Sequence, residues 1–391
     1  MHRYWLAVLA LSLCGRIAPA QATVSTATPL AKKVIEYGWD VPSPDYVRAH
    51  IREMEQRALD GIIFRLQGGG NVLEPAAWDE GKFAADFENV QQIAWEKFTD
   101  NFLILWAASE QDWFDDAQWQ AIEHNVGIMG KAARLAKCVG ICFDAEPYGK
   151  NPWAYSEAAH RAEKSFGEYE TMARQRGRQF MQALEKEFPH PQILTFYQLG
   201  LFQEFCRPMA AEERAATLSQ HGYALYPAFF NGMLEAASAE TGFHDGNENA
   251  YYYREAQPYF EAYHRITQRA LHLVDPALRE KYRAQVRVGQ ALYIDQYFGL
   301  RSMKVLGDYL TPQEQPQWFE HNVYWALYTA DQYVWCYSER MNWWTNTDVP
   351  AGAEEALVSA RRKIAEGAGL GLNIKPFIDA GGQREEGKSA P

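Results

Sequence analysis

The feature that most constrains the fold is an alternation of short apolar segments with long amphipathic segments, repeated along nearly the whole chain. Short apolar segments predict buried strands, and the longer periodic segments predict helices. This order predicts a parallel sheet with helices outside it, and eight such units close into a (β/α)8 TIM barrel. The expected strands are 33–39, 61–66, 101–107, 139–146, 192–197, 222–229, 286–294 and 333–338. The expected helices lie near 44–59, 86–98, 116–136, 156–187, 201–219, 252–282, 315–331 and 352–366.

A doubly wound open sheet is the alternative fold, but no Gly-rich phosphate-binding turn follows the first expected strand. We expect one barrel domain over residues 23–367. The polar, Gly/Asn-rich region 230–252 predicts an elaborated loop between the sixth strand and the sixth helix, above the barrel mouth. Residues 368–391 turn to Gly, Lys, Glu and Pro, and we expect a disordered tail there.

The first 22 residues have the pattern of a secretory signal peptide. His2 and Arg3 supply positive charge, an apolar run follows, and Ala20-Gln21-Ala22 is an A-x-A cleavage site. The run holds roughly 10 residues, against the ~20 that a membrane-spanning helix needs. We therefore expect a secreted or periplasmic protein, cut near Ala22 and not inserted in a membrane.

Charge and cysteine content restrict the possible partners. The net charge of −12 argues against nucleic acid. The sequence has no C-x-x-C pair, so we expect Cys138, Cys142, Cys206 and Cys336 to be buried free thiols. No motif indicates a cofactor, and the oligomeric state stays open. The chain has 13 Trp and 22 Tyr, and rings of this kind suit sugar binding when they face a cleft.

Two carboxylates close the fourth expected strand. Because side chains alternate along a strand, Cys142, Asp144 and Glu146 share one face, and Ile141 and Phe143 share the other. The apolar face suits packing under helices, and the small, acidic face suits the inside of a barrel. At roughly 6.5–7 Å apart, one ionised carboxylate raises the proton affinity of the other. Asp144 and Glu146 are therefore candidate catalytic groups for acid–base chemistry.

Other expected strand ends add candidates, because catalytic groups of such barrels come from several strands. Arg65 is expected to point inward, where it would pair with Glu36 or contact substrate. Glu339 follows Trp335 and Tyr337 on one face of the last strand, across the barrel from Glu146, and is a candidate second catalytic carboxylate. The expected substrate contacts are Trp39, Arg65, Tyr226, Asp295, Trp335 and Tyr337.

The segment from Gly140 to Glu146 resembles the fourth-strand motif D-G-x-D-x-D-x-E of chitinase-type family 18 glycoside hydrolases. It matches the Gly, the last Asp and the Glu, while Val139 and Cys142 stand where the motif has Asp. The resemblance implies that Glu146 is the proton donor and Asp144 its partner. It also implies that Tyr226 and Trp335 correspond to a sixth-strand Tyr and an eighth-strand Trp of that family. A broader similarity to glycosidase barrels implies a second carboxylate on a later strand.

These patterns lead to a secreted glycoside hydrolase that uses carboxylate general acid–base catalysis on a carbohydrate substrate and needs no metal. A non-catalytic glycan-binding barrel is one alternative. A metal-dependent hydrolase that uses Asp144, Glu146 and His244 is another. The sequence leaves open the sugar, the linkage, the anomeric outcome and the choice of second carboxylate.

Overall fold

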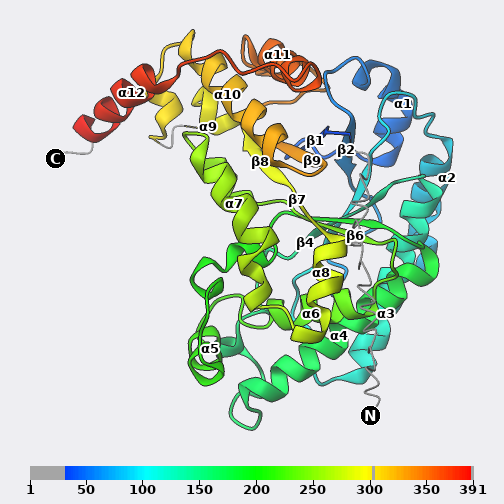
Figure 1. Cartoon of the computed structure of the whole chain (residues 1–391). Coiled ribbons are helices and arrows are strands. Elements are labelled where there is room, and N and C mark those ends of the chain that lie inside the picture. The colour runs from blue at the N-terminus through cyan, green and yellow to red at the C-terminus, as the bar shows by residue number, and fades with distance from the viewer. Residues whose placement is uncertain (1–30, 302–303, 389–391) are drawn as a thin grey trace, which may run out of the picture. The chain divides into compact units, whose positions relative to one another are not determined.

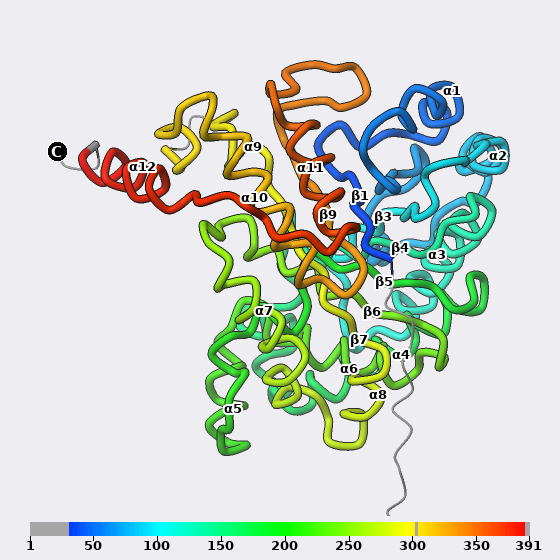
Figure 2. Tube along the Cα trace, turned by 45° about the horizontal axis from the view of Figure 1, so that its top comes forward, coloured from blue at the N-terminus to red at the C-terminus, as the bar shows by residue number. Residues whose placement is uncertain are grey.

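The computed structural model describes residues 31–301 and 304–388, which form a (β/α)8 barrel (Figure 1). The expected signal peptide lies outside the described residues. In Figures 1 and 2, helices surround a central set of strands, as the alternating sequence pattern predicted. None of the described helices is long and apolar enough to span a bilayer.

The described strands are all parallel and follow the order β7-β6-β5-β4-β3-β2-β1-β9-β8. β7 and β8 are two halves of one strand, separated by Gly289, and they pair with β6 and β9 respectively. The backbone N–H of Gly289 still donates to the Asp245 carbonyl at 2.7 Å, so the chain itself closes the barrel. The strands are β1 (Lys33–Gly38), β2 (Gly61–Phe64), β3 (Phe102–Trp106), β4 (Gly140–Asp144), β5 (Gln192–Thr195), β6 (Gly242–Asp245), β7 (Val286–Val288), β8 (Gln290–Tyr293) and β9 (Tyr333–Ser338).

Local sequence signals explain where several helices begin. The Asp115 carboxylate accepts hydrogen bonds from two backbone N–H groups of α3, and Ser165 with Glu168 forms a capping box on α4. α1 and α6 each have proline in the first turn, where no intrahelical N–H is lost. The helices are α1 (Pro44–Met54), α2 (Ala84–Gln92), α3 (Asp116–Leu135), α4 (Phe166–Glu187), α5 (Ala211–Leu218), α6 (Tyr226–Ala236), α7 (Gln257–Thr267), α8 (Arg279–Gln285), α9 (Ile294–Phe298), α10 (Glu314–Thr329), α11 (Ala353–Ala365) and α12 (Lys375–Lys388).

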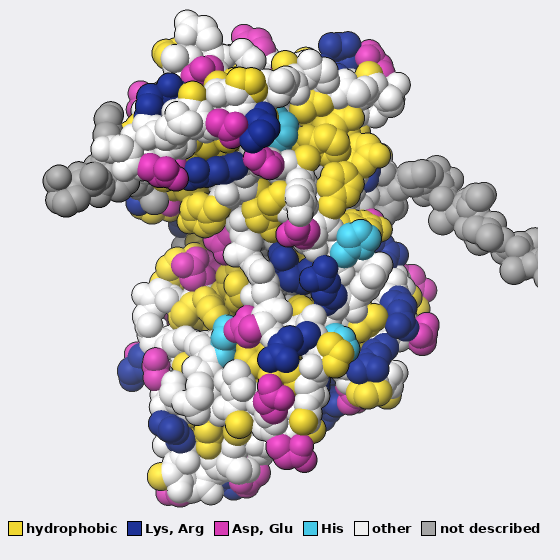
Figure 3. All heavy atoms as spheres, turned by 60° about the vertical axis from the view of Figure 1, so that its left-hand side comes forward, with side chains coloured by type: hydrophobic (Ala, Val, Ile, Leu, Met, Phe, Trp, Pro, Cys, Tyr) yellow, Lys and Arg dark blue, Asp and Glu magenta, His cyan; other side chains and the backbone are white. Residues whose placement is uncertain are grey.

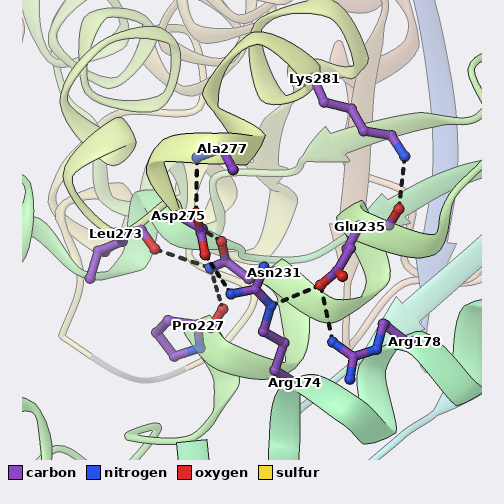
Figure 4. Close-up of polar contacts among 9 residues, drawn as sticks. All are labelled: Arg174, Arg178, Pro227, Asn231, Glu235, Leu273, Asp275, Ala277 and Lys281. Atoms are coloured by element: carbon purple, nitrogen blue, oxygen red, sulfur yellow. Dashed lines mark hydrogen bonds and ion pairs between the residues drawn. The ribbon is translucent and has the colours of Figure 1, made fainter. Parts of the chain in front are cut away.

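α4 and α6 pack with their backbones in close approach. A Cβ on Gly177 would lie 2.0 Å from the Phe229 carbonyl oxygen, and a Cβ on Gly232 would lie 1.9 Å from the Arg174 carbonyl oxygen. Only glycine fits at either position. The Arg174 guanidinium extends this contact by pairing with both Glu235 and Asp275 (Figure 4).

The Asn231 side chain ties α6 to the loop before α8. Its amide nitrogen donates to the Leu273 carbonyl at 3.0 Å, and its oxygen accepts the Asp275 N–H at 2.8 Å (Figure 4). These bonds satisfy loop groups that would otherwise be buried without partners.

The sixth strand was predicted wrongly. Residues 222–229 lead into α6, which is apolar on most of its surface because it lies buried against α4 and the barrel. The true β6 carries His244 and Asp245, both fully buried, so its sequence does not read as an apolar strand. Region 230–252 is therefore the rest of α6, then β6 and a 3-10 turn, η5 (Glu248–Tyr252), and not one elaborated loop.

The C-terminal segment also differs from its prediction, since α12 forms where we expected disorder. A Cβ on Gly381 would lie 2.8 Å from Leu310 Cδ2 and 2.9 Å from Leu306 Cδ1, so α12 packs closely on η8 (Leu306–Tyr309). Arg384 adds a hydrogen bond to the Tyr309 carbonyl oxygen at 2.8 Å. Tertiary contacts thus hold a segment whose composition is polar.

The four cysteines of the described chain are buried free thiols, as predicted. Burial raises the pKa of the Cys138, Cys142, Cys206 and Cys336 thiols, so they are poor nucleophiles and belong to the packed interior.

Candidate active site

The two faces of β4 point as its alternation predicted. Phe143 packs outward on Phe180 of α4 and Phe229 of α6, at ring-centroid distances of 5.3 and 6.1 Å. Cys142 and Asp144 occupy the opposite face, where both lie close enough to the Tyr37 hydroxyl of β1 to influence it electrostatically. Asp144 therefore projects into the barrel from the C-terminal end of its strand.

Asp144, Glu146 and Tyr148 form a connected polar group beyond the end of β4. The Tyr148 hydroxyl lies 2.9 Å from Asp144 Oδ2 and 3.1 Å from Glu146 Oε2. The Glu146 backbone N–H donates to Asp144 Oδ1 at 2.9 Å, which fixes the turn between the two acids. Asp144 is fully buried, whereas Glu146 and Tyr148 are exposed, so the group runs from the interior to the surface.

Burial raises the pKa of the Asp144 carboxyl to about 7, even though hydrogen bonds from the Glu146 N–H and Tyr148 act to lower it. The nearby Glu146 carboxylate raises this pKa further. At neutral pH a large fraction of Asp144 therefore carries a proton. A protonated Asp144, the Tyr148 hydroxyl and Glu146 form a continuous path of hydrogen-bonding groups from the barrel interior to solvent.

A third carboxyl, Glu248, faces this pair from the turn after β6. Burial, followed by the charges of Glu146 and Asp144, raises the pKa of Glu248 to about 8. Its backbone N–H donates to the Phe196 carbonyl at 3.0 Å, so the chain continues beside β5 after β6 ends. Glu248 thus stays mostly protonated at neutral pH and is a second candidate proton donor.

A buried network fixes the turn that carries Glu248. Asn247 adopts a left-handed backbone conformation with a φ of 45°. Its amide nitrogen donates to Gln290 Oε1 at 2.7 Å, and its oxygen accepts from Arg265 Nη2 at 3.2 Å. Asn tolerates this backbone conformation better than most residues, so the turn has a clear local cause.

Aromatic rings line the interior beside these acids. Trp335 stacks on Phe196 with centroids 4.5 Å apart, and Tyr251 lies parallel to Tyr337 at 5.6 Å. Tyr37 contacts the same rings from β1. Trp39 is 68% exposed and its side chain is hydrogen-bonded to Tyr337. The predicted residues Trp39, Trp335 and Tyr337 are therefore gathered in one aromatic group, although Trp335 is itself buried.

Glu339 lies at the end of β9, beyond the inward rings. It forms an ion pair with Arg301 and accepts a hydrogen bond from the Tyr293 hydroxyl at 3.1 Å. In the strand order, β9 and β4 are four strands apart in either direction, so Glu339 and Glu146 follow strands on opposite sides of the barrel, as expected. The ion pair with Arg301 fixes the position of the Glu339 carboxylate at this end of the strand.

Asp295 supports the end of β9, next to Glu339. It lies in α9 and is almost fully buried, where Oδ1 accepts from the Ser338 hydroxyl and Oδ2 accepts the Glu339 N–H at 3.1 Å. These bonds hold the end of β9 and thereby orient Glu339. The expected direct substrate contact by Asp295 stays a prediction.

The expected position of Tyr226 on the sixth strand was wrong. It starts α6, is 1% exposed, and packs on Trp153 while its hydroxyl donates to the Tyr197 carbonyl at 3.2 Å. Tyr223, three residues earlier, also lies near the acids: burial raises its pKa to about 12, with contributions from Glu146, Glu248 and Asp144. The error follows from assigning this segment to a strand.

The expected Glu36–Arg65 ion pair does not form. Glu36 is paired in register with Cys336 on the outward face of β1, and its carboxyl is hydrogen-bonded to Asp40. Burial raises the pKa of Glu36 well above its usual range and that of Asp40 to about 6, so the two acids can share a proton. Arg65 is exposed just after β2.

His244 does not join Asp144 and Glu146. It is fully buried in β6, where its ring contacts Tyr333 at 4.6 Å and Nε2 lies 3.0 Å from Gln192 Oε1. Burial, and then the charge of Arg287, lowers the pKa of His244 to about 3. Within the described residues, no three His, Cys, Asp or Glu side chains are placed to hold a metal ion. The expected metal-binding triad is therefore not assembled.

The sequence did not single out Tyr148 or Tyr251 as site residues, and it offered Glu248 only as a possible substrate contact. Glu248 lies in a polar segment that looked like a solvated loop, because the strand before it was not recognised. A glutamate shortly after a strand end, as at both β4 and β6, was the available signal. The site thus combines Asp144 and Glu248, two carboxyls that hold protons near neutral pH, with the exposed carboxyl of Glu146 and a wall of aromatic rings.

No protein-family model matches the sequence, and no characterised protein matches it by sequence. Among solved structures, the chain is similar to a GH18 chitinase from Pseudoalteromonas aurantia, with 10% identity, a TM-score of 0.41, and 84% of this chain and 100% of that chain covered. A Bacteroidetes-affiliated GH5 cellulase aligns with 10% identity and a TM-score of 0.43, over 90% and 95% of the two chains. A DHDPS from Cyanidioschyzon merolae aligns with 12% identity and a TM-score of 0.25, over 86% and 98%. At these scores, any functional assignment depends on the side chains of this chain.

Proposed function

We propose that the protein is a glycoside hydrolase that cleaves glycosidic bonds with the carboxyl groups beyond β4 and β6. The observation that carries this proposal is the Tyr148 hydroxyl, within 2.9 Å of Asp144 and 3.1 Å of Glu146. It joins a buried carboxyl with a raised pKa to an exposed carboxyl that can reach substrate. Glycosidases need such a proton-holding acid beside a second carboxylate.

In the proposed reaction, Glu146 transfers a proton to the glycosidic oxygen as the bond from that oxygen to the anomeric carbon breaks. Asp144 resupplies Glu146 through the Tyr148 hydroxyl. Water adds its oxygen to the anomeric carbon and gives up one proton to the connected group of Glu146, Tyr148 and Asp144. The carboxyls thus regain the proton that left with the glycosidic oxygen, and no other reactant is needed. Glu339, positioned by its ion pair with Arg301, would stabilise or attack the positively charged sugar ring.

The aromatic rings support a carbohydrate as substrate. Trp39 offers an exposed indole face beside Tyr337, and apolar ring faces suit stacking on the C–H faces of sugars. The expected export of the protein through its signal peptide remains part of this proposal, and would place the enzyme where polysaccharides are met.

The test is hydrolysis of a panel of polysaccharides and aryl glycosides by the wild type and by Glu146→Gln. Glu240→Gln, an exposed site just before the start of β6 and therefore at the end of the barrel opposite the acids, is the matched control. We expect Glu146→Gln to lose at least about a hundredfold in kcat with unchanged thermal unfolding, and the control to match the wild type. Saccharide binding without turnover by the wild type would support the non-catalytic glycan-binding barrel instead. Equal turnover by wild type and Glu146→Gln would overturn the assignment of Glu146.

A further inference from the structure

A groove beside α12 has no part in the site described so far. It has a volume of about 670 Å³ and lies between the segment from η5 to the start of α7 and the C-terminal helix. One wall includes Tyr252, Arg254 and Pro258, and the other includes Asp379, Gly382 and Gln383. In Figures 1 and 2, α12 lies on the same side of the barrel as α9 and α10.

η5 connects this groove to the candidate active site. Its first residue, Glu248, faces the two acids beyond β4, and Tyr251 stacks in the aromatic wall. The next residue, Tyr252, turns outward, is 60% exposed and lines the groove. A 3-10 turn rises about 2 Å per residue, so its five residues span only roughly 8–10 Å.

Electrostatic interactions also connect Tyr252, in the groove, with charged groups of the candidate active site. The charges of Glu248, Glu339 and Arg301 all influence the Tyr252 hydroxyl. Tyr252 therefore lies between the candidate catalytic groups and the groove.

The groove has the side chains that suit a sugar chain. Tyr252 supplies an exposed aromatic face, and the other walls supply hydrogen-bonding groups from Arg254, Asp379 and Gln383. Acidic and basic side chains are interspersed over the face of the molecule drawn in Figure 3, which argues for a neutral ligand rather than a polyanion.

The groove wall formed by α12 is held in place. Arg254 forms an ion pair with Glu385 of α12 at 2.9 Å, and Gly381 packs on Leu306 of η8 and on Leu310 just after it. The groove is thus bounded by two segments linked to each other.

We propose that the groove between η5 and α12 binds further sugar units of an extended, uncharged oligosaccharide or polysaccharide whose scissile bond lies at the acids beyond β4. This inference rests on the proposed function for the position of the scissile bond. It adds that the preferred substrate is a chain long enough to reach Tyr252, rather than a disaccharide or a simple glycoside.

The first experiment compares a long and a short neutral substrate of the same linkage, chosen from those the wild type hydrolyses. Loss of one stacking contact of about 0.5–1.5 kcal/mol corresponds to about 2- to 10-fold. We expect Tyr252→Ala to lower kcat/KM by that factor for the long substrate through KM, and to leave the short one unchanged. Tyr252→Phe, which keeps the ring, should restore wild-type values. Equal effects of Tyr252→Ala on both substrates, or none on either, would overturn the inference while leaving the proposed function standing.

A second pair of variants tests the other wall. A Cβ on Gly382 or on Gly387 would meet nothing within 4 Å, so leucine fits at either position of α12. Only Gly382 lines the groove. Gly382→Leu should weaken long-substrate binding, and Gly387→Leu should not; the same behaviour in both variants would count against the groove.

Affinity electrophoresis in gels that contain a soluble neutral polysaccharide separates the two proposals. If the wild type hydrolyses nothing, the proposed function fails, but retardation of the wild type that Tyr252→Ala reduces would still support the groove. Equal migration of the wild type and Tyr252→Ala in every polysaccharide would overturn the inference.

Discussion

Tyr148 places its hydroxyl 2.9 Å from Oδ2 of Asp144, although the tyrosine is 66% exposed and the aspartate is fully buried. One hydrogen bond therefore connects the barrel interior with solvent. Because the same hydroxyl reaches Glu146, a proton held on Asp144 has a direct route to the exposed carboxyl.

Tyr148→Phe should slow turnover while preserving the ring and the fold. The variant removes the hydroxyl that links the two carboxyls, so we expect kcat to fall by about 10- to 100-fold with little change in KM. Tyr328→Phe, a second exposed tyrosine on α10, is the matched control and should behave as the wild type. Steady-state kinetics on the best substrate decide the matter, and a Tyr148→Phe enzyme with wild-type kcat would contradict the relay.

The stability of the protein should depend on pH through Asp144. Its carboxyl has a pKa of about 7 in the folded state, against 3.8 for an unperturbed aspartate. Between these values the folded state binds more protons than the unfolded chain, so stability falls as pH rises through this window. At pH 8, ionisation of Asp144 lowers the free energy of unfolding by at most about 4 kcal/mol.

Asp144→Asn removes this ionisation. The measured quantity is the Tm of Asp144→Asn minus the Tm of the wild type. We expect this difference to be several degrees more positive at about pH 8 than at about pH 4.5. Thermal unfolding at both pH values measures the difference. A Tm difference independent of pH would show that Asp144 is not held protonated by burial.

Glu248→Gln should change the alkaline side of the pH–rate profile. Burial and the neighbouring acids give Glu248 a pKa of about 8, and Asp144 has one of about 7. If both protons are required, kcat/KM of the wild type declines in two steps as pH rises through these values. In Glu248→Gln we expect only the step near 7. Profiles that coincide for the two enzymes would remove Glu248 from the chemistry.

Gly177→Ala should destabilise the fold without touching the site. The added Cβ would lie 2.0 Å from the Phe229 carbonyl oxygen, which is main chain and cannot rotate away. We expect a loss of at least about 2 kcal/mol in the free energy of unfolding. Gly167→Ala, near the start of the same helix and open to solvent, should instead gain about 0.5–1 kcal/mol. Chemical denaturation of both variants checks the prediction, and similar effects would contradict the close approach of α4 and α6.

Periodicity predicted most of the barrel because each strand and helix there carries its own apolar pattern. It failed at β6, where His244 and Asp245 find partners only in the folded protein. The same failure left Glu248 as no more than a possible substrate contact, because the strand that positions it was not recognised.

The sequence by itself determined the (β/α)8 barrel and the inward direction of Asp144, because both follow from local alternation and from the order of the segments. Only the tertiary structure decided which groups surround Asp144: the Tyr148 hydroxyl bonds to it and its charge acts on Glu248, whereas His244 is bonded to Gln192 elsewhere in the barrel. The tertiary structure also decided that Lys375–Lys388 form a helix, because this segment packs on η8. The physical reason is that burial, pKa and side-chain contacts depend on neighbours distant in sequence, and a pattern of residue types specifies only the face on which a side chain starts.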